Sequence, residues 1–404
     1  MANICFALLK EGKTPPDRRA VLSPVSMTKA QERFPKASFI VESSKIRVFP
    51  DVAYENAEFE VLEDISQAAV MLGVKEVPVD KLIPNKKYFF FSHTIKKQPY
   101  NRDLLKAVLE KNIELYDHEV ITRRSGLRLI GFGYYAGLVG AYNGFRAYGL
   151  RHKTFNLPPA NTLTDISALH AQLAKIQLPP IKICLSGTGK VAAGAREILE
   201  KKGVKKVSVG DYLSKTYKVP VFCQLSVMDY NKRKDNQKGS LPDFMKNATY
   251  YESNFLRFAE VTQLFIAGHF YGDGAPYLFT REQAKAANFK IEVIADISCD
   301  IDGPVASTLR ASTIEKPFYG YDAQTEKEVA MDAEGAITVM AVDNLPCELP
   351  KDASEGFGDM FIENVLPAFF NDDKDGILHR ARMTKNGKLT KRFSYLQDYV
   401  DGKE

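Results

Sequence analysis

Short apolar runs, rich in β-branched and aromatic residues, alternate with amphipathic helical patterns along most of the 404-residue chain. Strands that helices separate in sequence pair in parallel within βαβ units, so this alternation predicts the α/β fold class. A helix is expected over Arg102–Glu110, and the polar stretch Asp229–Gly239 is expected to be a solvated loop. The expected strands are Ile4–Leu9, Ser38–Val41, Val70–Val74, Tyr88–Phe91, Glu114–Tyr116, Arg128–Phe132, Ile181–Leu185, Val207–Val209, Leu264–Ala267, Ile291–Asp296 and Ala336–Val342.

Composition excludes several classes of protein. Hydrophobic residues make up 45% of the chain and charged residues 26%, as in globular proteins of two or three domains. No apolar run approaches the roughly 20 residues of a membrane span, and the N-terminal apolar stretch is too short for a secretory signal. We therefore expect a cytoplasmic protein with no membrane partner. The net charge of +5 is small and the lysines are dispersed, which argues against a nucleic-acid partner. The five cysteines lack metal-ligand spacing, so we expect reduced thiols and no metal site.

Four glycines, Gly133, Gly137, Gly140 and Gly144, recur at spacings of four, three and four residues. This spacing places them on one face of a helix, where they allow close backbone approach at a cost of about 1 kcal/mol each in helix propensity. We expect tight helix packing between two domains here, and we place the first domain boundary in this helix.

A glycine-rich loop, "SGTGKVAAGA", joins an expected strand to an expected helix. Gly187 permits the tight turn and Gly189 lets the backbone approach a pyrophosphate, which would sit on the N–H groups at the helix N-terminus. Gly194 departs from the spacing of the usual dinucleotide fingerprint but still allows close packing. We predict a dinucleotide site at Gly187, Thr188 and Gly189. The alternative is a glycine turn that binds no nucleotide.

Asp211 lies roughly 20 residues beyond this loop, where a ribose-binding carboxylate is expected at the end of a second strand. A carboxylate there favours NAD over NADP, because it repels a 2′-phosphate. Lys205, Lys206 and Lys215 nearby keep NADP open, so the predicted cofactor is NAD or NADP.

Lys75 and His93 each follow an expected strand, Val70–Val74 and Tyr88–Phe91. In an open parallel sheet the carboxyl ends of neighbouring strands share one edge, where ligands bind. An imidazole titrates near physiological pH, and a desolvated lysine can also do so, so the two side chains are candidates for an acid–base pair. Taken alone, however, a single lysine and a single histidine are more often surface residues.

Three further charged residues fall at expected strand ends or loops: Arg19, Glu119 and Arg128. Arginine binds carboxylates through two parallel hydrogen bonds, so Arg19 and Arg128 could hold an acidic substrate. Each of the three is, by itself, more simply read as a partner in an ion pair.

The order of several segments along the chain resembles the lysine–2-oxoglutarate reductase (lysine-forming saccharopine dehydrogenase) family. That family belongs to the alanine dehydrogenase/transhydrogenase superfamily. The resemblance runs from Phe6 to about Tyr399, and alanine dehydrogenases do not share "FFSHTIK", "STIEKPFYGYD" or "DNLPCELPKDASEGFGDM". The other matching segments are "DRRAVLSP", "LGVKEVP", "LYDHEV", "FGYYAGLVG", "SGTGKVAAGA" and "ADISCDIDG".

The resemblance implies roles for individual residues. The catalytic lysine and histidine fall on Lys75 and His93, and the arginine that binds the substrate carboxylate falls on Arg19. Glu119 and Arg128 are implied to line the same cleft. The cofactor-binding positions implied, together with Asp211 from the spacing argument, are Gly187, Thr188, Gly189, Asp296, Asp300 and Asp343.

The resemblance also implies an architecture of two Rossmann-like domains with parallel sheets, separated by an active-site cleft. The substrate domain is expected at residues 1–136 plus 345–404, and the dinucleotide-binding domain at 137–344. The implied reaction condenses lysine with 2-oxoglutarate and reduces the imine to saccharopine, or runs in reverse. The alternatives are an amino-acid dehydrogenase that uses ammonia, as alanine dehydrogenase does, and a non-catalytic dinucleotide-binding protein. Whether the protein forms a homo-oligomer is left open.

Overall fold

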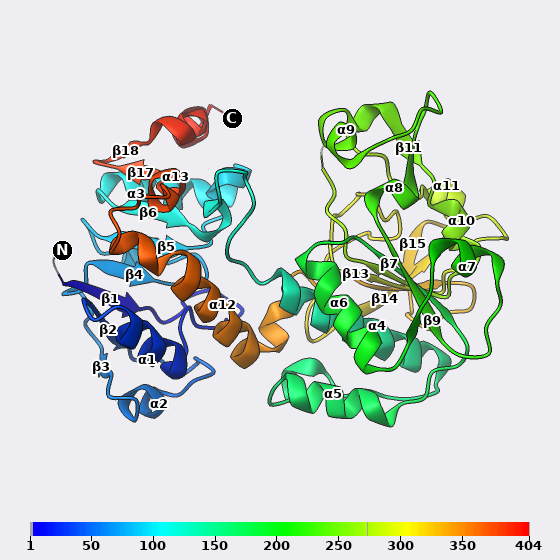
Figure 1. Ribbon diagram of the computed structural model, residues 1–404, viewed down its shortest axis with the longest axis horizontal. Helices are drawn as coiled ribbons and strands as arrows, with labels where there is room; N and C mark the ends of the chain where they lie inside the picture. The colour runs from blue at the N-terminus through cyan, green and yellow to red at the C-terminus, as the bar shows by residue number, and fades with distance from the viewer. Residues whose placement is uncertain (1–2, 273, 404) are drawn as a thin grey trace. The chain divides into compact units, whose positions relative to one another are not determined.

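The structure, a computed structural model, describes residues 3–272 and 274–403. The chain forms two compact units, each built around its own sheet (Figure 1). Unit 1 comprises Met1–Phe132 and Pro350–Glu404, and unit 2 comprises Gly133–Leu349. Both sheets have parallel strands at their centre, which confirms the predicted α/β class.

The sheet of unit 1 has six parallel strands in the order β3-β2-β1-β4-β5-β6. The order changes direction between β1 and β4, and ligands of such sheets bind at this switch point. The strands are β1 (Ile4–Leu8), β2 (Ala37–Glu42), β3 (Glu60–Leu62), β4 (Val70–Leu72), β5 (Lys87–Phe90) and β6 (Glu114–Asp117).

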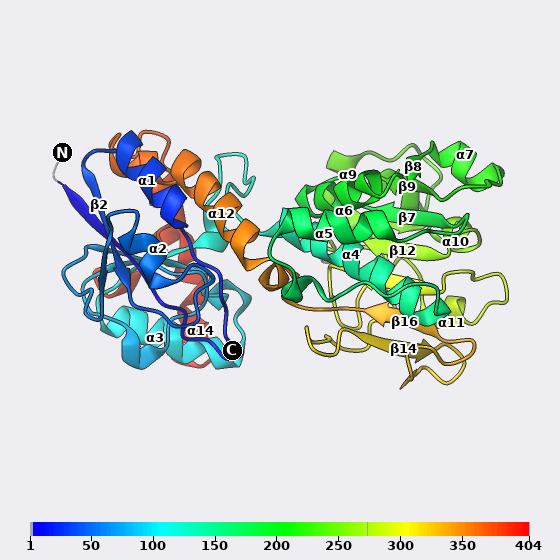
Figure 2. The same cartoon turned by 90° about the horizontal axis from the view of Figure 1, so that it is seen from below.

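Helices cover both faces of this sheet. Figure 2 shows α1 (Pro24–Arg33) beside α12 (Pro350–Asn364), while α3 (Arg102–Glu110) lies with α14 (Gln397–Asp401) on the other side. Ser23 caps α1 by accepting a hydrogen bond from the Ser26 N–H, and proline follows at the first helical position. The remaining short elements are α2 (Asp51–Glu55), α13 (Ile377–Ala381) and the hairpin β17 (Thr384–Lys385) and β18 (Lys388–Leu389).

The sheet of unit 2 has eight strands in the order β15-β14-β16-β13-β12-β7-β9-β8. Six are parallel, and β14 and β15 add an antiparallel edge. The strands are β7 (Lys182–Ser186), β8 (Lys205–Lys206), β9 (Val221–Leu225), β12 (Leu264–Ala267), β13 (Val293–Asp296), β14 (Phe318–Asp322), β15 (Lys327–Val329) and β16 (Ile337–Met340).

A hydrophobic core lies on each face of this sheet, because successive strand residues alternate between them. Ile183 and Leu185 pack toward one face, whereas Cys184 packs toward the other. The first face carries α4 (Gly133–His152), α5 (Ile166–Lys175) and α6 (Lys190–Lys201), and the second carries α7 (Val209–Ser214), α10 (Leu256–Ala259) and α11 (Arg281–Ala284). A small insertion between β9 and β12 contains α8 (Val227–Tyr230), β10 (Asn231–Arg233), α9 (Leu241–Lys246) and β11 (Tyr251–Ser253).

The glycine stripe of α4 packs inside unit 2, so the expectation that it joins two domains is wrong. A Cβ added at Gly137 would lie 1.9 Å from the Val191 carbonyl oxygen on α6, and one added at Gly194 would lie 2.0 Å from the Tyr134 carbonyl oxygen on α4. The two helices therefore touch backbone to backbone, and Gly144 faces Ala295 of β13.

Three expected elements differ from the structure. Arg128–Phe132 is not a strand, because the free edge of β6 is already covered by the C-terminal segment, where the Met383 N–H donates to the Leu115 carbonyl. Val207–Val209 is not a strand either, since α7 begins at Val209. Asp229–Gly239 is not a loop throughout, as β10 pairs with β11 inside it. Within the described residues, none of the helices combines the length and apolarity of a membrane span.

Candidate functional site

Lys75 and His93 follow β4 and β5, which pair directly in the sheet of unit 1. The strands are parallel, so both residues lie at the same edge of the sheet, as predicted. Lys75 also lies beside the switch point, because β4 pairs with β1 on its other side. Its side chain is half-buried.

A buried carboxylate fixes the turn that carries His93. Asp117, at the end of β6, accepts hydrogen bonds from the Ser92 N–H at 3.0 Å, the Ser92 hydroxyl at 2.5 Å and the Glu119 N–H at 2.7 Å. Burial raises the pKa of Asp117, while these donors oppose the rise. His93 itself has φ of 54°, a left-handed conformation that is uncommon for a residue with a side chain. The three bonds hold the backbone in this conformation.

The His93 ring is oriented by Glu76. Its Nδ1 lies 2.6 Å from Glu76 Oε1, and Lys13 Nζ lies 3.1 Å from Glu76 Oε2. Burial alone would raise the pKa of Glu76, but the hydrogen bond from His93 and the charge of Lys13 bring it down to about 2. An ionised carboxylate only accepts hydrogen bonds, so Nδ1 carries a hydrogen and Nε2 is left for proton exchange. Sequence reasoning missed Glu76 and Lys13; the one available signal was that Glu76 directly follows Lys75.

The backbone at Lys75 is held by Glu11, another residue that sequence reasoning missed. Glu11 follows β1, and its carboxylate accepts hydrogen bonds from the Val74 N–H at 2.7 Å and the Lys75 N–H at 2.8 Å. Burial raises the pKa of Glu11 to about 7 despite these donors. The β1 and β4 loops are thus tied together at the switch point.

Arg19 lies in the same unit and is almost fully buried, with 2% of its side chain exposed. Asp17 binds its guanidinium through two hydrogen bonds of 3.0 Å and 2.6 Å, and the Phe132 ring lies 4.2 Å from it. Phe132 in turn packs against Phe91 at 5.9 Å, and Phe91 stacks with His93 at 6.3 Å. A continuous chain of contacts therefore connects Arg19 with His93.

Glu119 and Arg128 form an ion pair of 3.0 Å. The Arg128 side chain is 47% exposed, and the structure assigns no partner within the described residues to the buried Glu119 Oε2. The structure thus brings together all five predicted residues of unit 1, with Arg19 as the most enclosed and Arg128 as the most accessible.

The stability of unit 1 is expected to depend on His118, which packs between the rings of Phe91 and Phe357. Burial lowers the pKa of His118 to about 4 from an ordinary value of 6.5. This stabilising contribution is present above pH 6.5 and is lost as the pH falls toward 4, because only the unfolded chain then takes up the proton. Between pH 6.5 and 5 the protein should lose about 2 kcal/mol of unfolding free energy that His118→Gln does not lose. Urea unfolding of both proteins at pH 7 and pH 5 measures this difference, and equal losses would contradict the assignment.

The predicted dinucleotide loop lies at the end of β7 in unit 2. Gly187 has φ of 99°, and a Cβ there would lie 2.5 Å from the Gly268 carbonyl oxygen, so only glycine fits this turn. A Cβ at Gly189 would meet nothing within 4 Å, which leaves the space in front of the loop open. Gly189 is also the N-cap of the 12-residue helix α6, whose first N–H groups and positive dipole end suit a phosphate.

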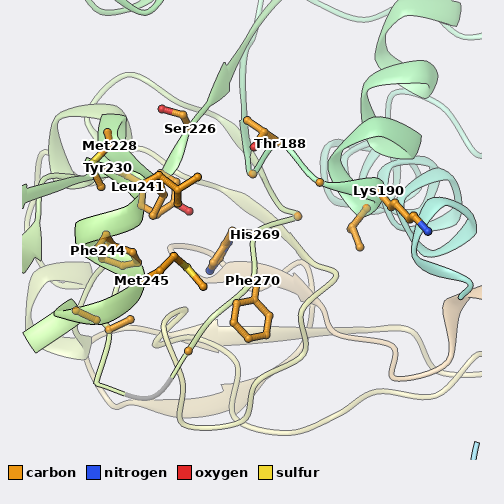
Figure 3. A pocket seen from close by; sticks show the side chains of 18 residues that line it. Thr188, Lys190, Ser226, Met228, Tyr230, Leu241, Phe244, Met245, His269 and Phe270 are labelled. Carbon is orange, nitrogen blue, oxygen red and sulfur yellow. The ribbon is translucent and has the colours of Figure 1, made fainter. Parts of the chain in front are cut away.

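A pocket of 590 Å³ opens beside this loop. Figure 3 shows Thr188 and Lys190 on one side of it and Leu241, Phe244 and Met245 on the other. The pocket also contains residues that follow β9 and β12, so it lies at the switch point of this second sheet, between β7 and its neighbours.

The structure does not bring Asp211 to this pocket. Asp211 lies in α7 and forms an ion pair of 2.9 Å with Lys215. The strand that pairs with β7 is β9, and Ser226 is the residue that follows it and lines the pocket. The expected strand ending near Asp211 is therefore wrong, because β8 is a two-residue edge strand.

Asp296, Asp300 and Asp343 lie near one another, since all three raise the pKa of Cys299, after burial as the largest cause. Asp296 is fully buried at the end of β13 and accepts from the Ser298 hydroxyl at 2.6 Å and the Thr308 hydroxyl at 2.7 Å. It therefore supports the loop after β13, whereas Asp343 is exposed. Across the described part of the chain, no group of three or more His, Cys, Asp or Glu side chains is arranged to hold a metal ion.

Comparison with known proteins gives the family. The model of the alanine dehydrogenase/PNT N-terminal domain matches residues 7–139. The mitochondrial α-aminoadipic semialdehyde synthases of Rattus norvegicus and Mus musculus are each 30% identical over 453 residues, covering 99% of this chain and 48% of theirs. The chain belongs to the alanine dehydrogenase/PNT superfamily. It spans about half the length of these curated relatives.

Other members of the superfamily match over most of both chains. The lysine-forming, NAD(+)-linked saccharopine dehydrogenase of Candida glabrata is 21% identical over 94% of this chain and 98% of its own. A solved L-alanine dehydrogenase has a TM-score of 0.63 at 15% identity, covering 98% of this chain and 99% of its own. A transhydrogenase from Sinorhizobium meliloti has a TM-score of 0.57 at 14% identity, covering 96% and 100%. These likenesses confirm the Rossmann-like fold and the resemblance seen in the sequence.

Proposed function

We propose that the chain is an NAD(P)-dependent oxidoreductase that condenses lysine with 2-oxoglutarate and reduces the imine to saccharopine, or catalyses the reverse. The observation that carries the proposal is the pairing of β4 with β5, which sets Lys75 and the Glu76-oriented His93 at one edge of a sheet beside its switch point. Its similarity to lysine-forming saccharopine dehydrogenases supports the choice of substrates.

The two side chains suit the proton transfers of this reaction. The lysine amine attacks a ketone only when it is neutral, although free lysine is mostly protonated near pH 7. His93 Nε2 is the candidate to accept that proton, because Glu76 occupies Nδ1. Lys75 is the candidate partner that returns a proton when water leaves the carbinolamine.

The substrates bring three carboxylates, and the arginines of unit 1 are their candidate partners. Arg128 is the accessible one, although it already pairs with Glu119. Arg19 is enclosed and bound by Asp17, so we propose that it supports the charge of the site from behind Phe132.

Unit 2 is the candidate dinucleotide-binding domain, with Gly187, Thr188 and Gly189 as the pyrophosphate loop. Its residues fit the group, because Gly189 faces open space at the N-terminus of α6. When bound, the nicotinamide would supply the hydride that reduces the imine. Asp296 and Asp300 would hold the loop after β13 near the ring, and Asp343 would face the substrate. NAD and NADP both remain candidates, since Ser226 rather than a carboxylate follows β9.

The deciding experiment follows oxidation of NADH and of NADPH with lysine plus 2-oxoglutarate, omitting each component in turn. Turnover that requires both substrates is expected. Equal turnover with ammonia in place of lysine, or with pyruvate in place of 2-oxoglutarate, would instead indicate an amino-acid dehydrogenase. Binding of the reduced cofactor without oxidation by any pair would indicate a non-catalytic protein.

Glu76→Gln is expected to lower kcat by about tenfold and to leave the affinity for NADH unchanged. An amide can no longer fix the Nδ1–H tautomer of His93 or balance the charge of Lys13, and such orienting contacts typically contribute about 10–100-fold. Steady-state rates with saturating lysine and 2-oxoglutarate test this, with NADH titration as the control. An unchanged kcat would show that the 2.6 Å contact has no role in turnover.

A further inference from the structure

The pocket beside the glycine loop has an unusual lining. Leu241 and Met245 on α9 and Phe270 after β12 are 53%, 63% and 80% exposed. All three belong to this one pocket of 590 Å³. Large apolar side chains gathered at one exposed hollow indicate a site for an apolar surface.

One polar side chain lies at the floor of the same pocket. His269 is 8% exposed, and its Nδ1 is 2.8 Å from the Ser186 hydroxyl at the end of β7. Its Nε2 is buried and has no hydrogen-bond partner among residues 3–272 and 274–403. Buried polar atoms are almost always paired, so this nitrogen lacks a partner that a ligand could supply. Figure 3 shows the His269 ring between Met245 and Phe270.

The charge state of His269 restricts the ligand. Burial lowers the pKa of His269 to about 4, so the ring is neutral at physiological pH. A neutral imidazole offers one hydrogen bond and no charge, which suits the edge of a base better than a phosphate. Either tautomer keeps the Ser186 bond: Nε2 then donates to a ring nitrogen or accepts from an exocyclic amine.

The position of the pocket points in the same direction. It runs from Gly187–Gly189 to Ser226 and the insertion after β9. A dinucleotide that crosses the switch point with its pyrophosphate on the loop places one nucleoside on the β9 side and the other toward β12 and β13.

We propose that this pocket holds the adenine ring of the dinucleotide between the α9 side chains and Phe270, with the base edge hydrogen-bonded to His269 Nε2. His269 is then a base-selecting residue, and the insertion from Val227 to Ser253 supplies one wall of the base site. The proposal rests on the proposed function in one respect, namely that the ligand is a dinucleotide.

Calorimetric titration with ADP, CDP and nicotinamide mononucleotide tests the proposal on the whole chain. The wild-type protein should bind ADP more tightly than CDP. His269→Phe should weaken ADP binding by about 5–10-fold, the value of one neutral hydrogen bond, and reduce the preference over CDP. Phe270→Ala should weaken ADP binding by a similar factor, without risk to folding because the side chain is exposed. Neither variant should change binding of nicotinamide mononucleotide, which lacks adenine.

Tyr250→Ala is the matched control, since Tyr250 is an exposed aromatic residue on the same insertion that does not line the pocket. It should bind ADP as the wild-type protein does. ADP affinities of His269→Phe and Phe270→Ala that equal that of the control would overturn the proposal, even if the enzyme turns over lysine and 2-oxoglutarate. Conversely, adenine selection by His269 in a protein that oxidises no NADH would leave the proposal standing and remove the proposed function.

Discussion

Replacing Lys75 by methionine is expected to lower kcat by about 10²–10⁴-fold, the usual contribution of a positioned acid or base. Methionine keeps the length and the apolar contacts of lysine but cannot transfer a proton. The Lys75 backbone should stay in place, because its N–H is held by Glu11 rather than by its own side chain. NADH affinity should therefore stay within about twofold, as expected for sites that share no contacts.

The control for this variant is Lys81→Met, an exposed lysine in the same connection between β4 and β5. It should turn over at the wild-type rate. A Lys75→Met enzyme that matches this control would remove Lys75 from the chemistry, and the proposed acid–base pair with it.

Gly137→Ala is expected to unfold or severely destabilise unit 2, by about 4 kcal/mol or more, which is at the upper end for single substitutions. The added methyl group would lie 1.9 Å from the Val191 carbonyl oxygen and 2.8 Å from the Ala195 nitrogen. Both are backbone atoms of α6, so no side chain can move aside. Helix α6 must shift, and the phosphate loop that leads into it must shift as well.

Urea unfolding and ADP titration measure these two effects. The matched control is Gly210→Ala, in helix α7, where an added Cβ meets nothing within 4 Å. This control should gain up to about 1 kcal/mol, because alanine favours the helix. Equal stability of the two variants would mean that α4 and α6 are not packed as closely as the structure has them.

The elements predicted best are buried on both sides. The expected strand Leu264–Ala267 coincides with β12, and the expected helix Arg102–Glu110 coincides with α3. A central parallel strand is apolar throughout and an amphipathic helix repeats every 3.6 residues, so both patterns are local. Lys75 and His93 could be placed at one edge for the same reason, because strand order and direction follow from the α/β class.

The Asp211 error has a local cause as well. "SVGD" was read as the end of a strand, whereas Ser208 is the N-cap of α7 and accepts a hydrogen bond from the Asp211 N–H. A Ser three residues before an acid is a known helix start, and it would have redirected the search to β9.

Other parts of the site could not be read from the sequence. Glu11 and Lys75 are 64 residues apart, and Lys13 and Glu76 are 63 apart. Their meeting depends on which loops the sheet register brings together, which no short segment encodes. The role of the α4 glycines was misjudged similarly, since a glycine face shows that something packs closely but not what it packs against.

Unit 1 is built from both ends of the chain, and this affects its biosynthesis. Phe357 and Phe361 of α12 pack on the rings of His118 and Phe89, and Tyr399 belongs to another core of the same unit. A ribosome releases the first 132 residues long before these partners exist, whereas unit 2 is contiguous and can close once Leu349 has emerged. The nascent N-terminal segment must therefore wait with an uncovered apolar sheet face, and a chaperone that shields it would be most needed during that interval.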